Sequence, residues 1–386
     1  MADERDPDRE RQPEPNREHA PGGRGGDEHS GEDGSETGGA PLVVTVGETQ
    51  GRLSAGVRET VRLPVLWLPW LPVAVCTVAF AAGVGLPERW RYLPLAASVV
   101  VLGLPHGAVD WAVLPRAVTG RLDARWILLV GALYLVAGGA YAVAWFLVPV
   151  ASAVGFVALT WFHWGQGELH PLVAVLGADH LDSRPRRALF VLVRGGLPML
   201  VPLLAFPERY RAVVAGFAAP FGGDLTTWPV TAEVRLALGV CFGALTVVTL
   251  ALGYRVADDH RAWAVDAGET ALLWAYFLVV PPVFAVGVYF CCWHAARHIV
   301  RVATFDDVSA DALARGRLGP AARRFAREAV LPTLGGLVVC WALWVTAPAP
   351  PTTLAGAAAV YLVAIAVMTL PHVVVVTALD GVQGYW

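Results

Sequence analysis

Long apolar stretches recur along most of this 386-residue chain, and they restrict its fold more than any other feature. A stretch of about 20 apolar residues with few charges is typical of a membrane-spanning helix. Only 16% of the residues are charged and 56% are hydrophobic, whereas ordinary soluble domains are about 25% charged. The stretches of this kind lie near residues 63–86, 92–114, 127–149, 152–169, 188–206, 234–253, 329–347 and 354–377. The sequence therefore predicts an all-α, polytopic membrane helical bundle.

A further apolar run, residues 268–300, is too long for one ordinary span and contains Pro281 and Pro282 near its middle. Proline removes a backbone donor and crowds the preceding turn, so this run forms either one long kinked helix or two short helices that meet at the prolines. The arginines distinguish these alternatives. With a cytoplasmic N-terminus and two spans here, most arginines fall in inner segments, as the positive-inside rule requires, whereas a single span would put the arginine-rich loop 301–327 outside. We therefore predict about ten spans (eight to ten) in the cell membrane, with both termini cytoplasmic.

The N-terminal segment has a different composition. Residues 1–40 contain 12 acidic residues, 5 arginines and no aromatic residue. Such a segment buries too little apolar surface to order itself. We predict a disordered acidic tail over residues 1–60 and an integral membrane helical domain, which carries any catalysis, over 61–386. The basic loop 315–327 lacks interleaved aromatic residues, which indicates contact with anionic lipid headgroups and argues against nucleic-acid binding.

Five histidines lie inside the apolar stretches: His106, His163, His294, His298 and His372. An ionisable side chain within a membrane is rare and is a functional candidate by default. In the ten-span topology these five residues lie on four helices that all run inward, and each falls in the cytoplasmic half of its helix. We therefore expect one histidine cluster at one membrane depth. Of the other histidines, we predict His19, His29, His180 and His260 at solvated surfaces and His170 at the membrane interface.

The cluster is chemically suited to a metal ion. Neutral imidazoles without a thiolate suit a late first-row metal such as iron, whereas zinc in a structural role is closed at four ligands. Residues i and i+4 share one face of a helix, so His294 and His298 can point at the same ion. Three carboxylates lie near the histidines in the sequence: Asp110, Glu168 and Asp380. Each of them either orients a metal-bound histidine or ends a helix near the lipid headgroups.

Aromatic residues flank the histidine motifs. We expect some of them to line a slot for a long apolar ligand that enters from the bilayer, and the rest to form interfacial belts. The candidates for the slot are Trp111, Trp161, Phe162, Trp164, Tyr289, Phe290 and Trp293. The five cysteines lie in apolar runs without CxxC spacing, which is typical of small core residues.

The motifs GLPHGAVDW, FHWGQGE, WHAARH and a late LPH resemble the Brp/Blh family of membrane-bound beta-carotene 15,15'-dioxygenases, from about residue 60 to the C-terminus. The resemblance implies that the protein uses O2 and a non-haem Fe2+ to cleave all-trans-beta-carotene at its central 15,15' double bond into two molecules of all-trans-retinal. It also implies that His106, His163, His294 and His298 are the iron ligands, and it suggests a functional link to a retinal-binding opsin. His372 matches the late PH element and is kept as a fifth ligand or as a group behind the ligands.

Other functions are open from the residues alone. A diiron membrane desaturase or hydroxylase also uses membrane histidines, although it is expected to carry more of them, in HxxxH and HxxHH clusters. A non-catalytic retinal or opsin biogenesis factor would show the same motifs as an active enzyme. A haem-binding electron carrier and a proton-coupled transporter are the remaining alternatives.

Overall fold

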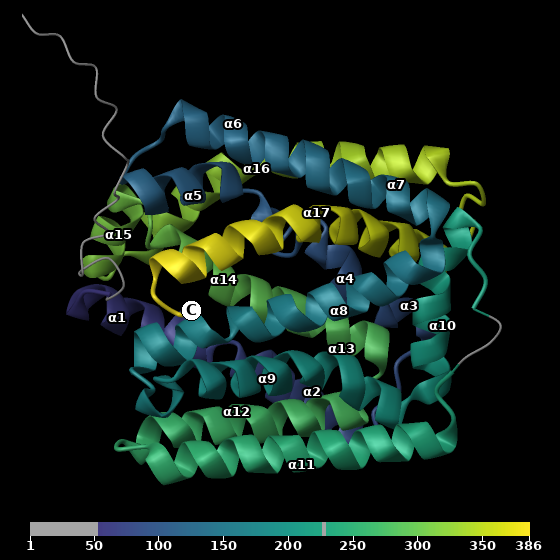
Figure 1. Ribbon diagram of the computed structural model, residues 1–386, viewed down its shortest axis with the longest axis horizontal. Helices are drawn as coiled ribbons and strands as arrows, with labels where there is room; N and C mark the ends of the chain where they lie inside the picture. Colours follow the sequence, from purple (N-terminus) through teal and green to yellow (C-terminus); the bar gives the residue numbers. More distant parts are fainter. Residues whose placement is uncertain (1–52, 226–228) are drawn as a thin grey trace, which may run out of the picture. The chain divides into compact units, whose positions relative to one another are not determined.

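The computed structural model describes residues 53–225 and 229–386, and all regular structure within these ranges is helical (Figure 1). Residues 1–52 lie outside the described residues, and with them most of the predicted disordered tail. Helix α1 (Ala55–Arg62) begins inside the segment predicted as tail. Its first turn is capped by Ser54, whose hydroxyl accepts a hydrogen bond from the Val57 backbone N–H at 3.3 Å.

The helical runs follow one another with short connections. The first half of the chain contains the π-helical turn η1 (Leu63–Trp67), α2 (Trp70–Ala81), α3 (Glu88–Arg91), α4 (Leu93–Ser98), the 3-10 turn η2 (Leu104–Gly107), α5 (Asp110–Thr119), α6 (Ala124–Leu133), the π-helical turn η3 (Tyr134–Gly138), α7 (Gly139–Leu147), α8 (Pro149–Gly167), the π-helical turn η4 (Pro171–Leu176), the 3-10 turn η5 (Asp179–Leu181) and α9 (Arg184–Ala205). The second half contains α10 (Pro207–Ala218), the 3-10 turn η6 (Ala219–Phe221), α11 (Ala232–Val256), α12 (His260–Val279), α13 (Pro282–Val288), the π-helical turn η7 (Tyr289–Ala295), α14 (Ala296–Ala303), α15 (Asp307–Ala314), α16 (Leu318–Thr346) and α17 (Leu354–Val382).

Seven of the described helical runs are long and apolar enough to cross a membrane, which is fewer than the ten spans predicted. They are Ala55–Ala81, Ala124–Leu147, Arg184–Ala205, Ala232–Val256, Pro282–Ala303, Leu318–Thr346 and Leu354–Val382. The predicted span near 92–114 is broken by the turn η2, which contains Pro105. Helix α8 carries the polar residues His163 and Gln166 near its end, and α12 contains the acidic residues Asp266 and Glu269. The run 92–114 is therefore too short, and helices α8 and α12 are too polar, to be recognised as spans from length and composition.

The surface of the outer helices is apolar. Leu128 and Leu135 on the α6–η3 run, Leu236 on α11 and Leu331 and Trp341 on α16 are all exposed. Soluble proteins rarely expose contiguous apolar surface on this scale. The long apolar helices and their exposed apolar side chains identify a multi-pass membrane protein.

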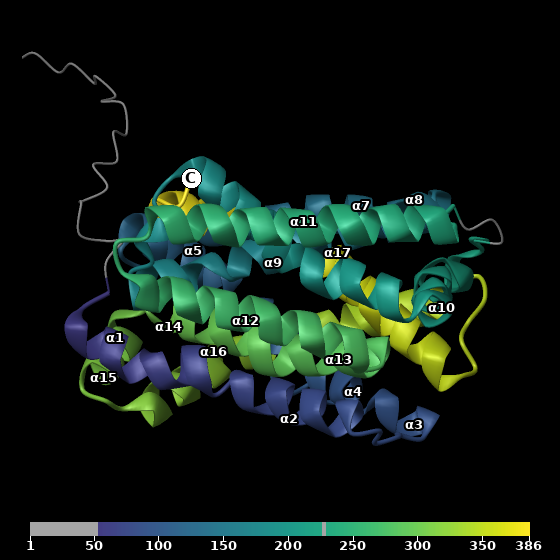
Figure 2. The same ribbon diagram turned by 90° about the horizontal axis from the view of Figure 1, so that it is seen from below.

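The apolar run 268–300 forms two helices rather than one. Helix α12 ends at Val279 and α13 begins at Pro282. Pro281 lies between them with φ −55° and ψ 136°, outside the helical region. Figure 2 shows that α12 and α13 leave this turn in opposite directions along the bundle. The prediction that two helices meet at the proline pair is therefore confirmed.

Helices α8 and α9 pack almost backbone to backbone. A Cβ atom at Gly165 would lie 2.1 Å from the Val191 carbonyl oxygen, and one at Gly195 would lie 1.9 Å from the Trp161 carbonyl oxygen. Small residues allow this close approach between helices in membranes. The contact fixes the position of His163, which lies two residues before Gly165 on α8.

Candidate metal centre

The five histidines that the sequence predicted to cluster lie together in the interior, and all are buried. Four separate segments carry them: η2 carries His106, α8 carries His163, the continuous η7–α14 run carries His294 and His298, and α17 carries His372.

The five rings form a compact arrangement. His163, His294, His298 and His372 form a cycle in which neighbouring ring centroids are 4.8, 6.4, 5.0 and 4.8 Å apart. The His106 ring contacts all four, at centroid distances of 6.3, 5.5, 5.5 and 5.0 Å in the same order. Five rings this close together could supply nitrogens to one metal ion.

Two irregular helical segments place these rings. His106 belongs to a short 3-10 turn, and its Nδ1 hydrogen-bonds to the Gly103 carbonyl three residues earlier, which leaves Nε2 facing the cluster. His294 belongs to the π-helical turn η7, and its ring lies nearly parallel to that of His298, at 11°. Such π-helical turns occur frequently at functional sites in proteins.

Several imidazole nitrogens in the cluster have no hydrogen-bond partner among the described residues. They are His106 Nε2, His163 Nδ1, both ring nitrogens of His298, and His372 Nε2. A buried polar atom without a partner costs about 1–3 kcal/mol. His163 Nε2 and His294 Nε2 lie 3.1 Å apart, and two nitrogens bound at about 2.1 Å and at right angles to one metal ion would be separated by about 3.0 Å. The donor set and its unpartnered nitrogens therefore fit a metal ion.

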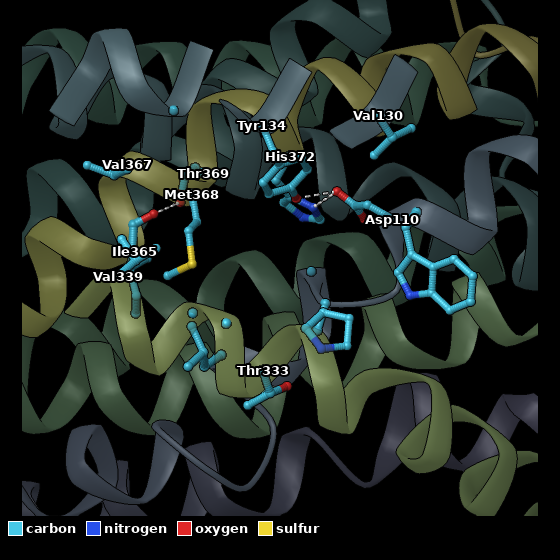
Figure 3. Close-up of a pocket in the computed structure, with 18 of the residues that line it drawn as sticks. Asp110, Val130, Tyr134, Thr333, Val339, Ile365, Val367, Met368, Thr369 and His372 are labelled. Carbon is cyan, nitrogen blue, oxygen red and sulfur yellow. Dashed lines mark hydrogen bonds and ion pairs between the residues drawn. The ribbon is translucent and has the colours of Figure 1, made fainter. Parts of the chain in front are cut away.

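Asp110 holds His372 from outside the cluster. Its Oδ2 accepts hydrogen bonds from the Tyr134 hydroxyl at 2.7 Å and from His372 Nδ1 at 2.8 Å, and Figure 3 shows the three side chains meeting at one side of a cavity. A carboxylate on one ring nitrogen directs the other toward a metal. Two groups of side chains have ligand atoms within 4.8 Å of one another: His106, His163 and His294 form one, and Asp110, His298 and His372 the other.

Glu168 does not bond a histidine. It belongs to an arginine–glutamate quartet formed by Glu168, Arg194, Glu269 and Arg297, all of them buried. Glu168 accepts from Arg194 at 2.6 Å, from Arg297 at 2.9 Å and from the Trp293 indole at 3.0 Å, and Glu269 pairs with the same two arginines. A buried arginine is charged and requires a carboxylate partner, whereas a neutral imidazole does not. Glu168 therefore pairs with the arginines and not with a histidine.

Asp380 is also engaged by an arginine. It accepts from Arg301 at 2.6 Å and from the Trp386 indole at 3.1 Å. Of the three predicted carboxylates, Asp110 is therefore the one that contacts a histidine, and neither Glu168 nor Asp380 lies at an exposed helix end.

Two histidines predicted at the surface or interface are buried. His180 Nε2 lies 3.2 Å from an Asp266 carboxylate oxygen, and His170 Nδ1 lies 2.9 Å from the Tyr385 hydroxyl. The polar residues next to His180 and His170 in the sequence indicated surface positions. In the structure both rings are instead covered by partners that are distant in the sequence, Asp266 and Tyr385. His260 is exposed as predicted, while His19 and His29 lie outside the described residues.

Two apolar cavities meet at the histidine cluster. A large chamber of about 690 Å³ lies among η2, the α6–η3–α7 run, α16 and α17, and a middle cavity of about 110 Å³ lies among α8, α9, α10, α13 and α17. His106, Phe290, Ile365 and Thr369 line both cavities. Figure 3 shows part of the large chamber, with Ile365, Met368 and His372 of α17 along one wall.

Three of the aromatic residues predicted for a substrate slot line these cavities. Trp111 lines the large chamber, Trp164 the middle cavity and Phe290 both. The other four line neither of the two: Trp161, Phe162, Tyr289 and Trp293. Phe162 is 40% exposed on the outer surface, because successive residues of a helix point about 100° apart and its neighbour His163 points inward.

Sequence reasoning overlooked two features of the site. Tyr134 was hidden within an apolar stretch, and nothing local marks its hydroxyl as a partner of Asp110. The quartet had a clearer signal, because Arg194 and Glu269 are charged residues inside or beside apolar runs and each requires a buried partner.

Comparison with known proteins identifies the family. The family model described as beta-carotene 15,15'-dioxygenase matches residues 97–380, which include all five clustered histidines. The chain belongs to this family. It is 54% identical over 349 residues to the probable beta-carotene 15,15'-dioxygenase Blh of Halobacterium salinarum strain NRC-1, which covers 90% of this chain and 99% of the relative. It is 33% identical over 335 residues to the probable beta-carotene 15,15'-dioxygenase Brp of Halobacterium salinarum strain R1, which covers 81% of this chain and 90% of the relative. No solved structure matches the chain significantly.

Proposed function

We propose that this protein cleaves all-trans-beta-carotene at its central 15,15' double bond and releases two molecules of all-trans-retinal. O2 is the oxidant: the carbon–carbon double bond breaks, and each new aldehyde takes one oxygen atom. The observation that carries the proposal is a buried histidine cluster at the wall shared by two apolar cavities. The family membership and the names of the two relatives support the same reaction.

We further propose that the cluster holds one non-haem Fe2+ through His106, His163, His294 and His298, with His372 as a fifth ligand. The five buried imidazoles offer the type of nitrogen donor that suits iron, and several of these nitrogens have no partner in the described part of the chain. When bound, the iron would supply the activation of O2, a chemistry that amino-acid side chains do not provide.

The side chains around the cluster position the substrate. A polyene offers no hydrogen-bonding groups, so its place is set by shape, and the residues shared by the two cavities define where its middle lies. His106 and Phe290 lie at this boundary, with ring centroids 5.4 Å apart. Asp110 keeps the His372 proton on Nδ1, and the apolar walls exclude water from the aldehydes as they form.

We also propose that the chain crosses the cell membrane ten times, with the run 92–119 and helices α8 and α12 completing the seven apolar spans. The opposite directions of α12 and α13 support this count. Figure 1 shows the start of α1 and the C-terminus at the same end of the helices as α15, which belongs to the arginine-rich segment 301–327. The positive-inside rule assigns that end to the cytoplasm, so both termini would be cytoplasmic. The retinal released would then be available in the membrane to a retinal-binding opsin.

Expression in a bacterium that accumulates beta-carotene tests the function. We expect the yellow colour to fade and retinal to appear in extracts, with one iron per purified chain. The His294→Ala variant is the control and should leave the carotene intact. If the wild-type chain is folded and loaded with iron but forms no retinal, the reaction is not carotene cleavage, and a non-catalytic retinal or opsin biogenesis factor becomes the better assignment.

A dinuclear centre, as in diiron desaturases and hydroxylases, is the second candidate. It is favoured by one observation, the presence of two adjacent ligand groups, of which Asp110, His298 and His372 form the second. Against it, the Asp110 Oδ2 atom already accepts two hydrogen bonds, which leaves Oδ1 as the one carboxylate oxygen of Asp110 for a second metal. Metal analysis of the purified protein separates the two candidates, since two iron atoms per chain would contradict the mononuclear proposal.

A further inference from the structure

A third cavity continues from the middle cavity toward the end of the bundle that carries α3 and α10. This outer cavity has a volume of about 600 Å³. It shares a set of lining residues with the middle cavity: Leu95, Val213, Phe217, Pro282, Val283 and Leu362. The large chamber, the middle cavity and the outer cavity therefore follow one another, and the histidine cluster lies at the boundary between the first two.

The outer cavity differs chemically from the large chamber. Its rim carries Glu88 and Arg209, which are exposed, and Arg91, which is half-buried. The polar side chains of the large chamber are, by contrast, mainly those of the metal centre itself, Asp110, His106 and His372. The outer cavity is thus an apolar space with a charged opening at the end of the helices, whereas the large chamber lies behind helices that expose leucines to lipid.

The volumes on the two sides of the histidines are nearly balanced. The large chamber has a volume of about 690 Å³, and the middle and outer cavities, of about 110 and 600 Å³, together have about the same volume; the large chamber and the outer cavity are both partly open at the surface. Beta-carotene is symmetric about the bond that is cut, so its two halves require equal space. A site with a single chamber would have to fold the rigid polyene back on itself, which its conjugated double bonds prevent.

The relative sizes of the middle and outer cavities also match the shape of half a carotenoid. The middle cavity is narrow, and Phe156 and Phe217 meet beside it with ring centroids 5.6 Å apart. A polyene chain is thin and its end ring is broad, so the chain suits the narrow middle cavity and the ring suits the wide outer one.

We propose that the middle and outer cavities form one binding subsite for the second half of the carotenoid, with the polyene in the middle cavity and the end ring in the outer cavity. This inference rests on the proposed function. The substrate then lies extended through a continuous tunnel, and the position of the cut is set from both ends: by the large chamber on one side and by the outer cavity on the other. The residues at the junction of the two cavities decide whether a full-length carotenoid fits.

Two variants that narrow this junction test the inference. Val213 on α10 and Val283 on α13 are half-buried and line both cavities, so Val213→Trp and Val283→Trp each place a bulky ring in the path from opposite walls. Val154→Trp is the matched control, because Val154 on α8 is 58% exposed on the outer surface and lines none of the three cavities. Two substrates are compared: beta-carotene, and an apocarotenal that keeps one ring and the central double bond but ends shortly beyond it.

We expect each junction variant to lower kcat/KM for beta-carotene by about 100-fold while changing that for the truncated apocarotenal by less than about threefold. The control should match the wild type on both substrates. Iron content, measured first, shows that each variant retains its metal centre, and a variant that loses iron is set aside in favour of the other. Equal loss on both substrates with iron retained overturns the tunnel. Failure of the wild type to cleave either substrate would instead refute the proposed function.

Discussion

The histidine cluster and the arginine–glutamate quartet are two buried polar groups in the same membrane bundle, and they share two segments, α8 and the η7–α14 run. Helix α8 leads from His163 to Glu168, and Arg297 lies between His294 and His298. In the quartet two glutamates face two arginines, and every carboxylate oxygen accepts at least one hydrogen bond. In the cluster the groups are neutral, and several nitrogens bond to nothing in the described part of the chain.

The difference separates a structural role from a functional one. Charges buried in apolar surroundings must be paired within the protein, and in the quartet each glutamate pairs with both arginines. Several unpartnered imidazole nitrogens that converge on one point are costly, which favours a bound metal ion there. The quartet accordingly holds the helices together, and the cluster is the group that could hold a metal ion. The predictions below probe this contrast.

The largest effect is expected from His294→Ala. The variant should lose bound iron and all retinal formation, because the ring lies 3.1 Å from His163 across the proposed metal position. Its stability without metal should fall, because the lost ring leaves a cavity and His163 Nε2 loses its partner, but no buried charge is left unpaired. Metal analysis, retinal assays and thermal unfolding in detergent provide the measurements. A variant that kept its iron would show that the cluster is structural, like the quartet.

Glu168→Gln should show the reverse pattern. Removing one charge of the quartet leaves Arg194 and Arg297 with a single carboxylate, which typically destabilises a protein by about 3–5 kcal/mol. Chemical unfolding in detergent measures this change, and the protein that remains folded should still bind iron. Glu59→Gln, at an exposed position of α1, is the matched control and should unfold like the wild type. Wild-type stability for Glu168→Gln would contradict the structural role of the quartet.

A smaller effect is expected at Tyr134, which bonds the carboxylate behind His372. Tyr134→Phe removes the hydroxyl that donates to Asp110 and should weaken iron binding by about tenfold. Cobalt substituted for iron should show shifted visible absorption bands, a change that a loss of packing alone would not cause. Tyr141→Phe is the control, because the Tyr141 hydroxyl donates to the Ser152 carbonyl away from the cluster. Identical spectra for the two variants would remove Tyr134 from the metal centre.

The smallest effect concerns a third polar group at the helix ends. Burial alone would raise the pKa of Asp306, but hydrogen bonds from Arg324 and Ser309 and the charge of Arg116 outweigh it and lower this pKa below its ordinary value. The carboxylate therefore contributes stability above the ordinary pKa of an unfolded aspartate, about 3.9, and the contribution is lost as the pH falls through the folded pKa.

Asp306→Asn should accordingly cost about 1 kcal/mol at neutral pH, and the cost should shrink below about pH 4. High salt should also reduce it, because these side chains lie near solvent, whereas the cost of Glu168→Gln should not respond to salt. Unfolding curves at several pH values and salt concentrations provide the comparison. An equal salt response for the two variants would show that the quartet is reached by solvent.

The main lines of the fold were predictable, because the membrane requires long apolar helices and the arginines indicate their direction. The number of spans was harder to predict. The turn η2 breaks one predicted span and polar residues interrupt two others, because these positions serve the site rather than the bilayer. Within the site, the five histidines stood out as polar side chains in apolar stretches. Their shared depth followed from the topology alone.

Which polar groups would meet could not be predicted, since it depends on helix rotation and on contacts between distant residues. Glu168 follows His163 closely in the sequence but turns to two arginines, while Asp110 meets Tyr134 and His372, which lie 24 and 262 residues away. The burial of His180 and the outward position of Phe162 have the same origin.

The sequence by itself determined that this is a helical membrane protein with a set of histidines at one level, because apolar length and charge placement are local properties of the chain. Only the tertiary structure decided which nitrogens are left without partners and that the cavities meet beside them. Those features arise from the close packing of α8, α9, α13 and α17, and packing depends on all four helices at once.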